Sequence, residues 1–114
     1  MEGDLWQEIR ETQRLLELAL SESKRRGEVM VRAEAEYYTA KAEASFALKE
    51  EGVPVTFIQT VIKGVPEVCE AMTRYHAAQV EYENAREGRL VFKKRLDVLR
   101  EQLQREWSEA GGRQ

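Results

Sequence analysis

Two prolines near the middle of this 114-residue chain constrain its fold more than any other feature. Pro54 and Pro66 bracket a short apolar segment, and a long, uninterrupted helical pattern lies on either side of them. Proline lacks a backbone N–H and ends helices, so we expect the chain to double back between the two. The sequence therefore predicts an all-α fold: one domain over residues 1–114, built as a long antiparallel helical hairpin with a short helix at its tip.

Local signals set the expected ends of the helices. Asp4 suits an N-cap, Gly52 suits a C-terminal cap, and Pro66 suits a first helical position. The segment between the long helices is rich in β-branched residues, but a single strand without a partner is not viable, which favours a helix there. The predicted ranges are 4–51 for the first long helix, 56–63 for the tip helix, 66–108 for the second long helix and 109–114 for a flexible tail.

An alternating four-three spacing of apolar residues marks a coiled-coil-like seam on both long helices. The seam becomes polar at Ser23, Arg26 and Arg89, where the hairpin is expected to be weakest. The seam positions are Leu5, Ile9, Thr12, Leu16, Ala19, Ser23, Arg26, Met30, Ala33, Tyr37, Ala40, Ala44 and Ala47 on the first helix, and Val68, Ala71, Tyr75, Ala78, Tyr82, Ala85, Arg89, Phe92, Leu96, Leu99 and Leu103 on the second.

The position of the tip also predicts which residues face each other. Folding the two helices antiparallel about the midpoint would place Tyr37 level with Ala78 and Gly27 level with Gly88. Two glycines at one level suggest a close crossing or a bend, since glycine inside a helix costs about 1 kcal/mol relative to alanine. Two independently tolerated surface glycines are the alternative.

More apolar residues are present than a two-helix seam needs. Around residues 15–20 the apolar arc exceeds half of the helix circumference, wider than the stripe of a helix with one partner. Soluble monomers rarely expose so much contiguous apolar surface. We therefore expect a homodimer that forms a four-helix bundle, or a higher oligomer, although a different protein could cover the same faces. The expected oligomer interface comprises Leu15, Leu18, Leu20, Val91 and Val98.

The tip helix offers a second candidate contact surface. Its four large apolar residues are expected to share one helical face, beyond the main seam. They suit the binding of a partner protein, and covering the end of the hairpin is an equally good structural role. These residues are Phe57, Ile58, Val61 and Ile62.

No combination of residues indicates catalysis, a cofactor or a metal. His76 is the sole histidine, Cys69 the sole cysteine, and the two are seven positions apart, too far to chelate one ion comfortably. The Glu-x-x-His pair of di-metal helical bundles is absent because Thr73 occupies the position three before His76. Lys63 and Gly64 lack the flanking residues of a phosphate-binding loop. We expect no enzyme, no small-molecule substrate and no cavity suited to chemistry.

The distribution of charge is more informative than the net charge of −3. Residues 22–32 carry +2 and residues 86–95 carry +4, and an antiparallel hairpin would bring the two stretches side by side. Such a basic region could bind a phosphate backbone, although it lacks interleaved aromatic residues and its glutamates could pair with it as ordinary helix salt bridges. The possible nucleic-acid patch comprises Lys24, Arg25, Arg26, Arg89, Lys93, Lys94 and Arg95.

Several short motifs follow one another along this chain in a defined order. They are Ala40-Lys41-Ala42-Glu43, the turn Gly52-Val53-Pro54-Val55-Thr56, the stop Lys63-Gly64, and a terminal Arg105-Glu106-Trp107, with Tyr82, Glu87 and Lys93 between the last two. In this order they resemble a set of small phage and prophage proteins of Gram-positive bacteria, over about residues 37–108. Such proteins are generally of unknown function and often lie among early replication and recombination genes. The resemblance implies a phage-derived cytoplasmic protein and supplies no catalytic residues.

These observations together favour a non-enzymatic helical scaffold or interaction protein that acts through oligomerisation and protein contacts. The alternatives are an accessory nucleic-acid-binding protein in phage recombination or replication, and an inhibitor of a host protein. No apolar run approaches the roughly 18 residues of a membrane span, so no membrane contact is expected. A single cysteine fits the reducing cytoplasm, the host cytoplasm if the protein is phage-encoded.

Overall fold

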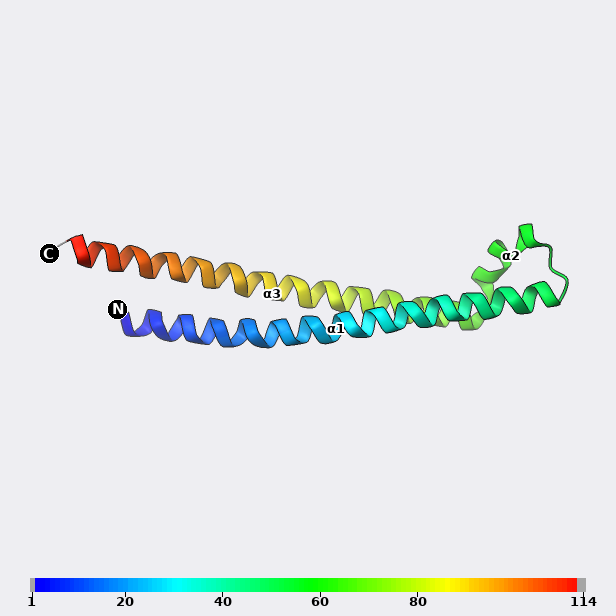
Figure 1. The fold of residues 1–114 in the computed structure, drawn as a ribbon, viewed down its shortest axis with the longest axis horizontal. Coiled ribbons are helices and arrows are strands. Elements are labelled where there is room, and N and C mark those ends of the chain that lie inside the picture. Colours follow the sequence, from blue (N-terminus) through cyan, green and yellow to red (C-terminus); the bar gives the residue numbers. More distant parts are fainter. Residues whose placement is uncertain (1, 113–114) are drawn as a thin grey trace. The chain divides into compact units, whose positions relative to one another are not determined.

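A computed structural model describes residues 2–112 and has the expected all-α architecture. Two long helices, α1 (Glu2–Glu50) and α3 (Pro66–Gly112), are joined by the short helix α2 (Val55–Val61) and a 3₁₀ turn, η1 (Ile62–Gly64) (Figure 1). No strand occurs within residues 2–112. The predicted helical hairpin with a helix at its tip is confirmed.

The end of α1 is closed by a glycine, as the sequence predicts. Gly52 has a positive φ of 87°, a conformation that side chains with a Cβ rarely adopt. Its N–H donates to the carbonyl of Lys49 at 3.1 Å, and the N–H of Val53 donates to the carbonyl of Leu48 at 3.0 Å. This pair of hydrogen bonds is the Schellman motif, which satisfies carbonyls at a helix end that would otherwise lack partners.

Two other predicted ends are wrong by a few residues. α1 begins at Glu2, so Asp4 lies inside the helix rather than capping it. α3 continues to Gly112, past the expected end at residue 108, so most of the predicted flexible tail is helical; Arg113 and Gln114 lie outside the described residues. Glu109 and Ala110 favour a continued helix, whereas Gly111 and Gly112 do not, and the helix nevertheless includes them.

The contacts within the chain divide it into two compact units. Unit 1 combines α1 up to Lys24 with α3 from Glu83 onward, and unit 2 spans Arg25–Tyr82, which includes the tip. On α1 the boundary falls between Ser23 and Arg26, where the predicted seam turns polar. Polar side chains at this point contribute less hydrophobic stabilisation to the seam than the leucines of unit 1.

Unit 1 is held together by a leucine-rich core. Leu5 and Ile9 of α1 pack with Leu96 and Leu99 of α3, all of them buried, and Leu16 and Leu103 pack against this group. Every predicted seam position of α3 is buried or half-buried in the structure, as is every one of α1 except Ala47. The seam predicted from the four-three spacing is therefore confirmed.

Unit 2 is packed with small and aromatic residues, and its register differs from the prediction. Tyr37 stacks on Tyr75, with ring centroids 6.0 Å apart, rather than lying level with Ala78. A Cβ added at Gly27 would lie 3.2 Å from the ring of Tyr82, whereas one added at Gly88 would meet nothing within 4 Å. The predicted pairing of the two glycines is wrong.

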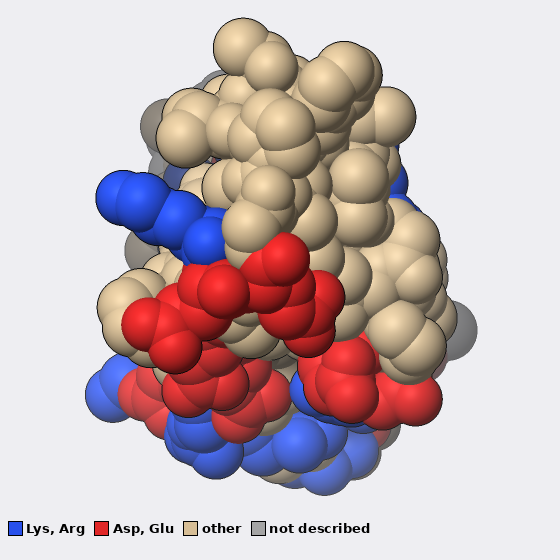
Figure 2. All heavy atoms as spheres, turned by 90° about the vertical axis from the view of Figure 1, so that its right-hand side faces the viewer, with Lys and Arg blue, Asp and Glu red and all other residues tan. Residues whose placement is uncertain are grey.

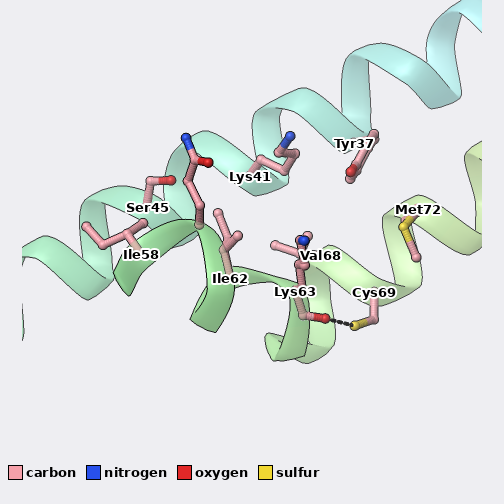
Figure 3. A pocket seen from close by; sticks show the side chains of 10 residues that line it. Tyr37, Lys41, Ser45, Ile58, Ile62, Lys63, Val68, Cys69 and Met72 are labelled. Atoms are coloured by element: carbon pink, nitrogen blue, oxygen red, sulfur yellow. Dashed lines mark hydrogen bonds between the residues drawn. The ribbon is translucent and has the colours of Figure 1, made fainter. Parts of the chain in front are cut away.

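The tip explains this difference in register. α2 and η1 fold back over the last turns of α1, where Ile58 and Ile62 share a pocket wall with Ser45 (Figure 3). α1 therefore continues beyond the level at which α3 begins at Pro66. A tip that only bridged the two helix ends would have given the register expected from the midpoint.

Candidate functional site

Unit 2 contains a pocket that the sequence did not predict. Its volume is about 490 Å³, within the range of roughly 300–1,000 Å³ typical of small-molecule sites. The sequence predicted no cavity suited to chemistry and gave no sign of this pocket, which forms because the tip folds back against both long helices (Figure 3). The pocket is lined by Tyr37, Lys41, Ser45, Ile58, Gln59, Ile62, Lys63, Val68, Cys69 and Met72.

The apolar part of the pocket comes from three segments. Ile58 of α2 and Ile62 of η1 are one helical turn apart, so they present the same face to the long helices. Both are buried, as is Val68 in the first turns of α3. Burial of each such side chain contributes about 1.5–3 kcal/mol, which holds the tip helix in place.

A thiol fixes the end of η1 against α3. The Cys69 Sγ–H donates to the carbonyl oxygen of Lys63 at 2.9 Å, and Figure 3 shows this hydrogen bond at the edge of the pocket. Cys69 is half-buried and is not in a disulfide. It acts here as a small packing residue with a polar contact to the backbone.

Two lysines supply the charge of the pocket. Lys41 projects from α1 and Lys63 from η1, so they come from different walls (Figure 3). The Lys41 Nζ lies 5.2 Å from the centroid of the Tyr37 ring and 5.9 Å from that of Tyr38, within the distance of a cation–π interaction. None of the ten described lining residues is acidic, so the pocket has a net positive charge.

An aromatic cluster supports the wall that carries Lys41. The ring of Tyr37 stacks on Tyr38 and on Tyr75, at 5.7 and 6.0 Å between centroids. The Tyr75 hydroxyl donates to Glu34 Oε2 at 3.3 Å. Desolvation raises the pKa of Tyr75, and the charge of Glu34 raises this pKa further. The hydroxyl therefore keeps its proton, and its hydrogen bond to the carboxylate, to a higher pH than an ordinary tyrosine would.

The structure divides the predicted partner-binding face of the tip. Ile58 and Ile62 are buried and serve the structural role, whereas Phe57 is 60% and Val61 43% exposed. The four residues therefore do not form one exposed surface. Val55 is also exposed, and α2 contains no charged residue. Figure 2 shows uncharged side chains over this part of the tip, with a group of acidic side chains below them.

The predicted oligomer interface lies in unit 1 and is largely open. Leu18, Leu20, Val91 and Val98 are exposed, and Leu15 is half-buried. Leu20 and the exposed Leu90 border a shallow groove of about 350 Å³, whose other lining residues are Leu16, Arg89, Lys93, Leu96, Asp97 and Arg100.

The basic residues proposed to bind nucleic acid have different surroundings. Arg26 is half-buried and forms a salt bridge with Glu81. Arg89 is half-buried beside the groove of unit 1. Arg25 belongs to unit 2 with Arg26, whereas the other five belong to unit 1. The exposed members are Lys24, Arg25, Lys93, Lys94 and Arg95.

Residues 2–112 contain neither a candidate metal site nor a candidate membrane span. Within this range, no three histidine, cysteine or acidic side chains lie close enough to hold a metal ion. Neither long helix contains, between residues 2 and 112, a stretch apolar enough to cross a bilayer.

Lys41 and Lys63 lie in two of the short motifs of the sequence, but the sequence does not show that they line one pocket. Lys63 also stands next to Gly64 at the end of the tip, where a cationic side chain interacts favourably with helix carbonyls. No periodicity could reveal the site, because it depends on where the tip helix docks. In comparisons with known proteins, no family model matches this chain, and no curated protein or solved structure is significantly similar to it.

Proposed function

We propose that this chain is a non-enzymatic helical-hairpin protein that acts through protein contacts, first of all with a second copy of itself. One observation carries the proposal: large apolar side chains on both helices of unit 1 remain exposed although the core is complete without them. Leu18 is 56% exposed and Val91 64%. Exposed apolar side chains in such number are typical of interaction sites in soluble proteins.

The spacing of these residues suits a helical partner. Val91 and Val98 are seven positions apart and therefore lie on the same face of α3, and Leu15 and Leu18 share a face of α1. Burying the exposed half of each such side chain would contribute about 1 kcal/mol. In a homodimer both copies contribute five, which would supply on the order of 10 kcal/mol before the cost of association, against the roughly 8 kcal/mol of net free energy at micromolar affinity. A homodimer that forms a four-helix bundle is the simplest assembly.

Analytical ultracentrifugation of a matched pair of variants tests this proposal. The double variant Val91→Lys, Val98→Lys should dissociate to a folded monomer at micromolar concentration. Val80→Lys is the control, because Val80 is exposed to a similar degree on the same helix but belongs to unit 2. A wild-type protein that sediments as a folded monomer throughout the micromolar range would exclude self-association.

Nucleic-acid binding is the second candidate, and the consecutive exposed residues Lys93, Lys94 and Arg95 favour it. The salt bridge of Arg26 weakens the case for that residue. Phosphate contacts should give DNA binding at about 50 mM salt that falls steeply by about 200 mM. A triple Lys93→Gln, Lys94→Gln, Arg95→Gln variant should lose this binding, and absence of binding by the wild type at low salt would remove the candidate.

Affinity purification from expressing cells distinguishes the proposed roles. Co-purification of one host protein would support a role as an inhibitor of that protein. Co-purified material that is lost after nuclease treatment would support nucleic-acid binding. We also propose a phage-derived, cytoplasmic protein. The order of the short motifs from Ala40 to Trp107 supports the origin, and the single free cysteine fits a reducing compartment.

A further inference from the structure

We propose that the pocket of unit 2 binds a small organic anion with an apolar body, whose acidic group is held by Lys41 and Lys63. This inference concerns a different unit from the exposed leucines and valines of the proposed protein contacts, and it does not depend on them.

The size of the pocket indicates a small molecule. At about 490 Å³ it can hold a ligand of one or two rings, or an aliphatic chain of similar volume. Its walls come from α1, the tip and the first turns of α3, so a bound molecule would be surrounded by separate segments (Figure 3). Ligand sites between packed helices are commonly built in this way.

The lining indicates that the body of the ligand is apolar. Ile58, Ile62 and Val68 are buried and provide aliphatic surface, while Tyr37 provides an aromatic wall. Met72 lies on the α3 side, and its flexible thioether can adjust to ligands of different shape. A strongly hydrophilic ligand would leave this surface without a favourable contact.

The charges indicate that the polar end of the ligand is negative. Lys41 and Lys63 are the charged groups among the ten lining residues, and both are cationic. Contact with the rings of Tyr37 and Tyr38 limits the positions open to Lys41, which reduces the entropy lost when it binds an anion. The hydroxyl of Ser45 and the amide of Gln59 can donate further hydrogen bonds to an acidic group.

Two fluorescent probes with the same ring framework test the proposal. One is 8-anilinonaphthalene-1-sulfonate, an anion, and the other is N-phenyl-1-naphthylamine, which lacks the sulfonate. We expect the anion to bind at least about tenfold more tightly, a difference that corresponds to about 1.4 kcal/mol. Equal affinity for the two probes would overturn the proposal.

Variants of the two lysines test whether Lys41 and Lys63 cause the preference for the anionic probe. Lys41→Gln with Lys63→Gln should abolish the preference for the anion, whereas Lys41→Arg with Lys63→Arg should retain it because the charge remains. Lys49→Gln is the matched control, since Lys49 lies in the last turn of α1 and does not line the pocket. A preference unchanged in the glutamine variant would contradict the assignment of the two lysines.

Amide chemical shifts identify the surface that is bound. Titration of the ¹⁵N-labelled protein with the anionic probe should shift the signals of residues that line the pocket, such as Ser45, Gln59 and Cys69. Shifts concentrated around Val91 and Val98 would mean that the probe binds the exposed apolar surface of unit 1, which would refute the pocket. Circular dichroism of each variant checks that it is folded.

Discussion

Replacing Ile62 by alanine is expected to release the tip from the hairpin while the long helices stay folded. Ile62 is 6% exposed and lies in the turn that follows α2. Isoleucine-to-alanine substitutions at buried sites cost about 2–5 kcal/mol, from lost burial and the cavity left behind. α2 has seven residues, fewer than the roughly 12 that an isolated helix needs for marginal stability. Docking must therefore provide nearly all of its stability.

Hydrogen exchange of backbone amides measures this effect locally. A loss of about 3 kcal/mol in docking should accelerate exchange in residues 55–64 by about 100-fold, if the tip opens as a unit. Exchange in the leucine core of unit 1 should be unchanged. The far-UV circular dichroism should change little, because α1 and α3 contain nearly all of the helical residues.

The neighbouring position provides the control. Val61 is 43% exposed and one residue away, so Val61→Ala should accelerate exchange far less, with a cost of at most about 1 kcal/mol. Equal acceleration in the two variants would show that docking of Ile62 does not hold the tip, and a change in helix propensity could not produce it, because alanine favours a helix more than valine or isoleucine does. Normal protection of residues 55–64 in the Ile62 variant would refute the docking argument altogether.

Three further outcomes are expected. Gly52→Ala should lower the free energy of unfolding by about 1–2 kcal/mol in urea denaturation, because Gly52 has a positive φ. Gly64→Ala is the control and should change it by less than about 0.5 kcal/mol, since the added Cβ meets no atom within 4 Å. Leu96→Ala should cost about 2–5 kcal/mol and Val98→Ala at most about 1 kcal/mol, by the same measurement. The pKa of Tyr75 is raised in the folded state, so the unfolded chain loses this proton at lower pH than the folded protein does. The free energy of unfolding should therefore fall above about pH 10. The Tyr75→Phe variant should show a smaller fall when urea denaturation is measured at increasing pH.

The two long helices, α1 and α3, could be predicted from the sequence because the signals that mark them are local. The four-three spacing of Leu5, Ile9 and their successors identifies the seam without knowledge of the partner helix. Gly52 likewise identifies the end of α1, since only a residue tolerant of positive φ fits there. The seam and the helix end each depend on residues close together in sequence, so the sequence alone predicts them.

The docking of the tip helix and the register could not be predicted because they depend on contacts between distant residues. Ile58 and Phe57 are adjacent and similarly apolar, yet one is buried and the other exposed. What separates them is the direction in which the tip folds back, which also creates the pocket and places Tyr37 against Tyr75. No residue within the tip segment specifies that direction by itself.

The single reversal of the chain has a consequence for the order of folding. Facing residues in unit 2 are already far apart in sequence, by 41 positions for Tyr75 and Glu34 and by 55 for Arg26 and Glu81. The core of unit 1 joins residues still further apart, and closing a longer loop costs more entropy. We expect structure to form first near the turn and then toward the termini. Destabilising substitutions near Gly52 should therefore lower the folding rate, and those near Leu96 should mainly raise the unfolding rate.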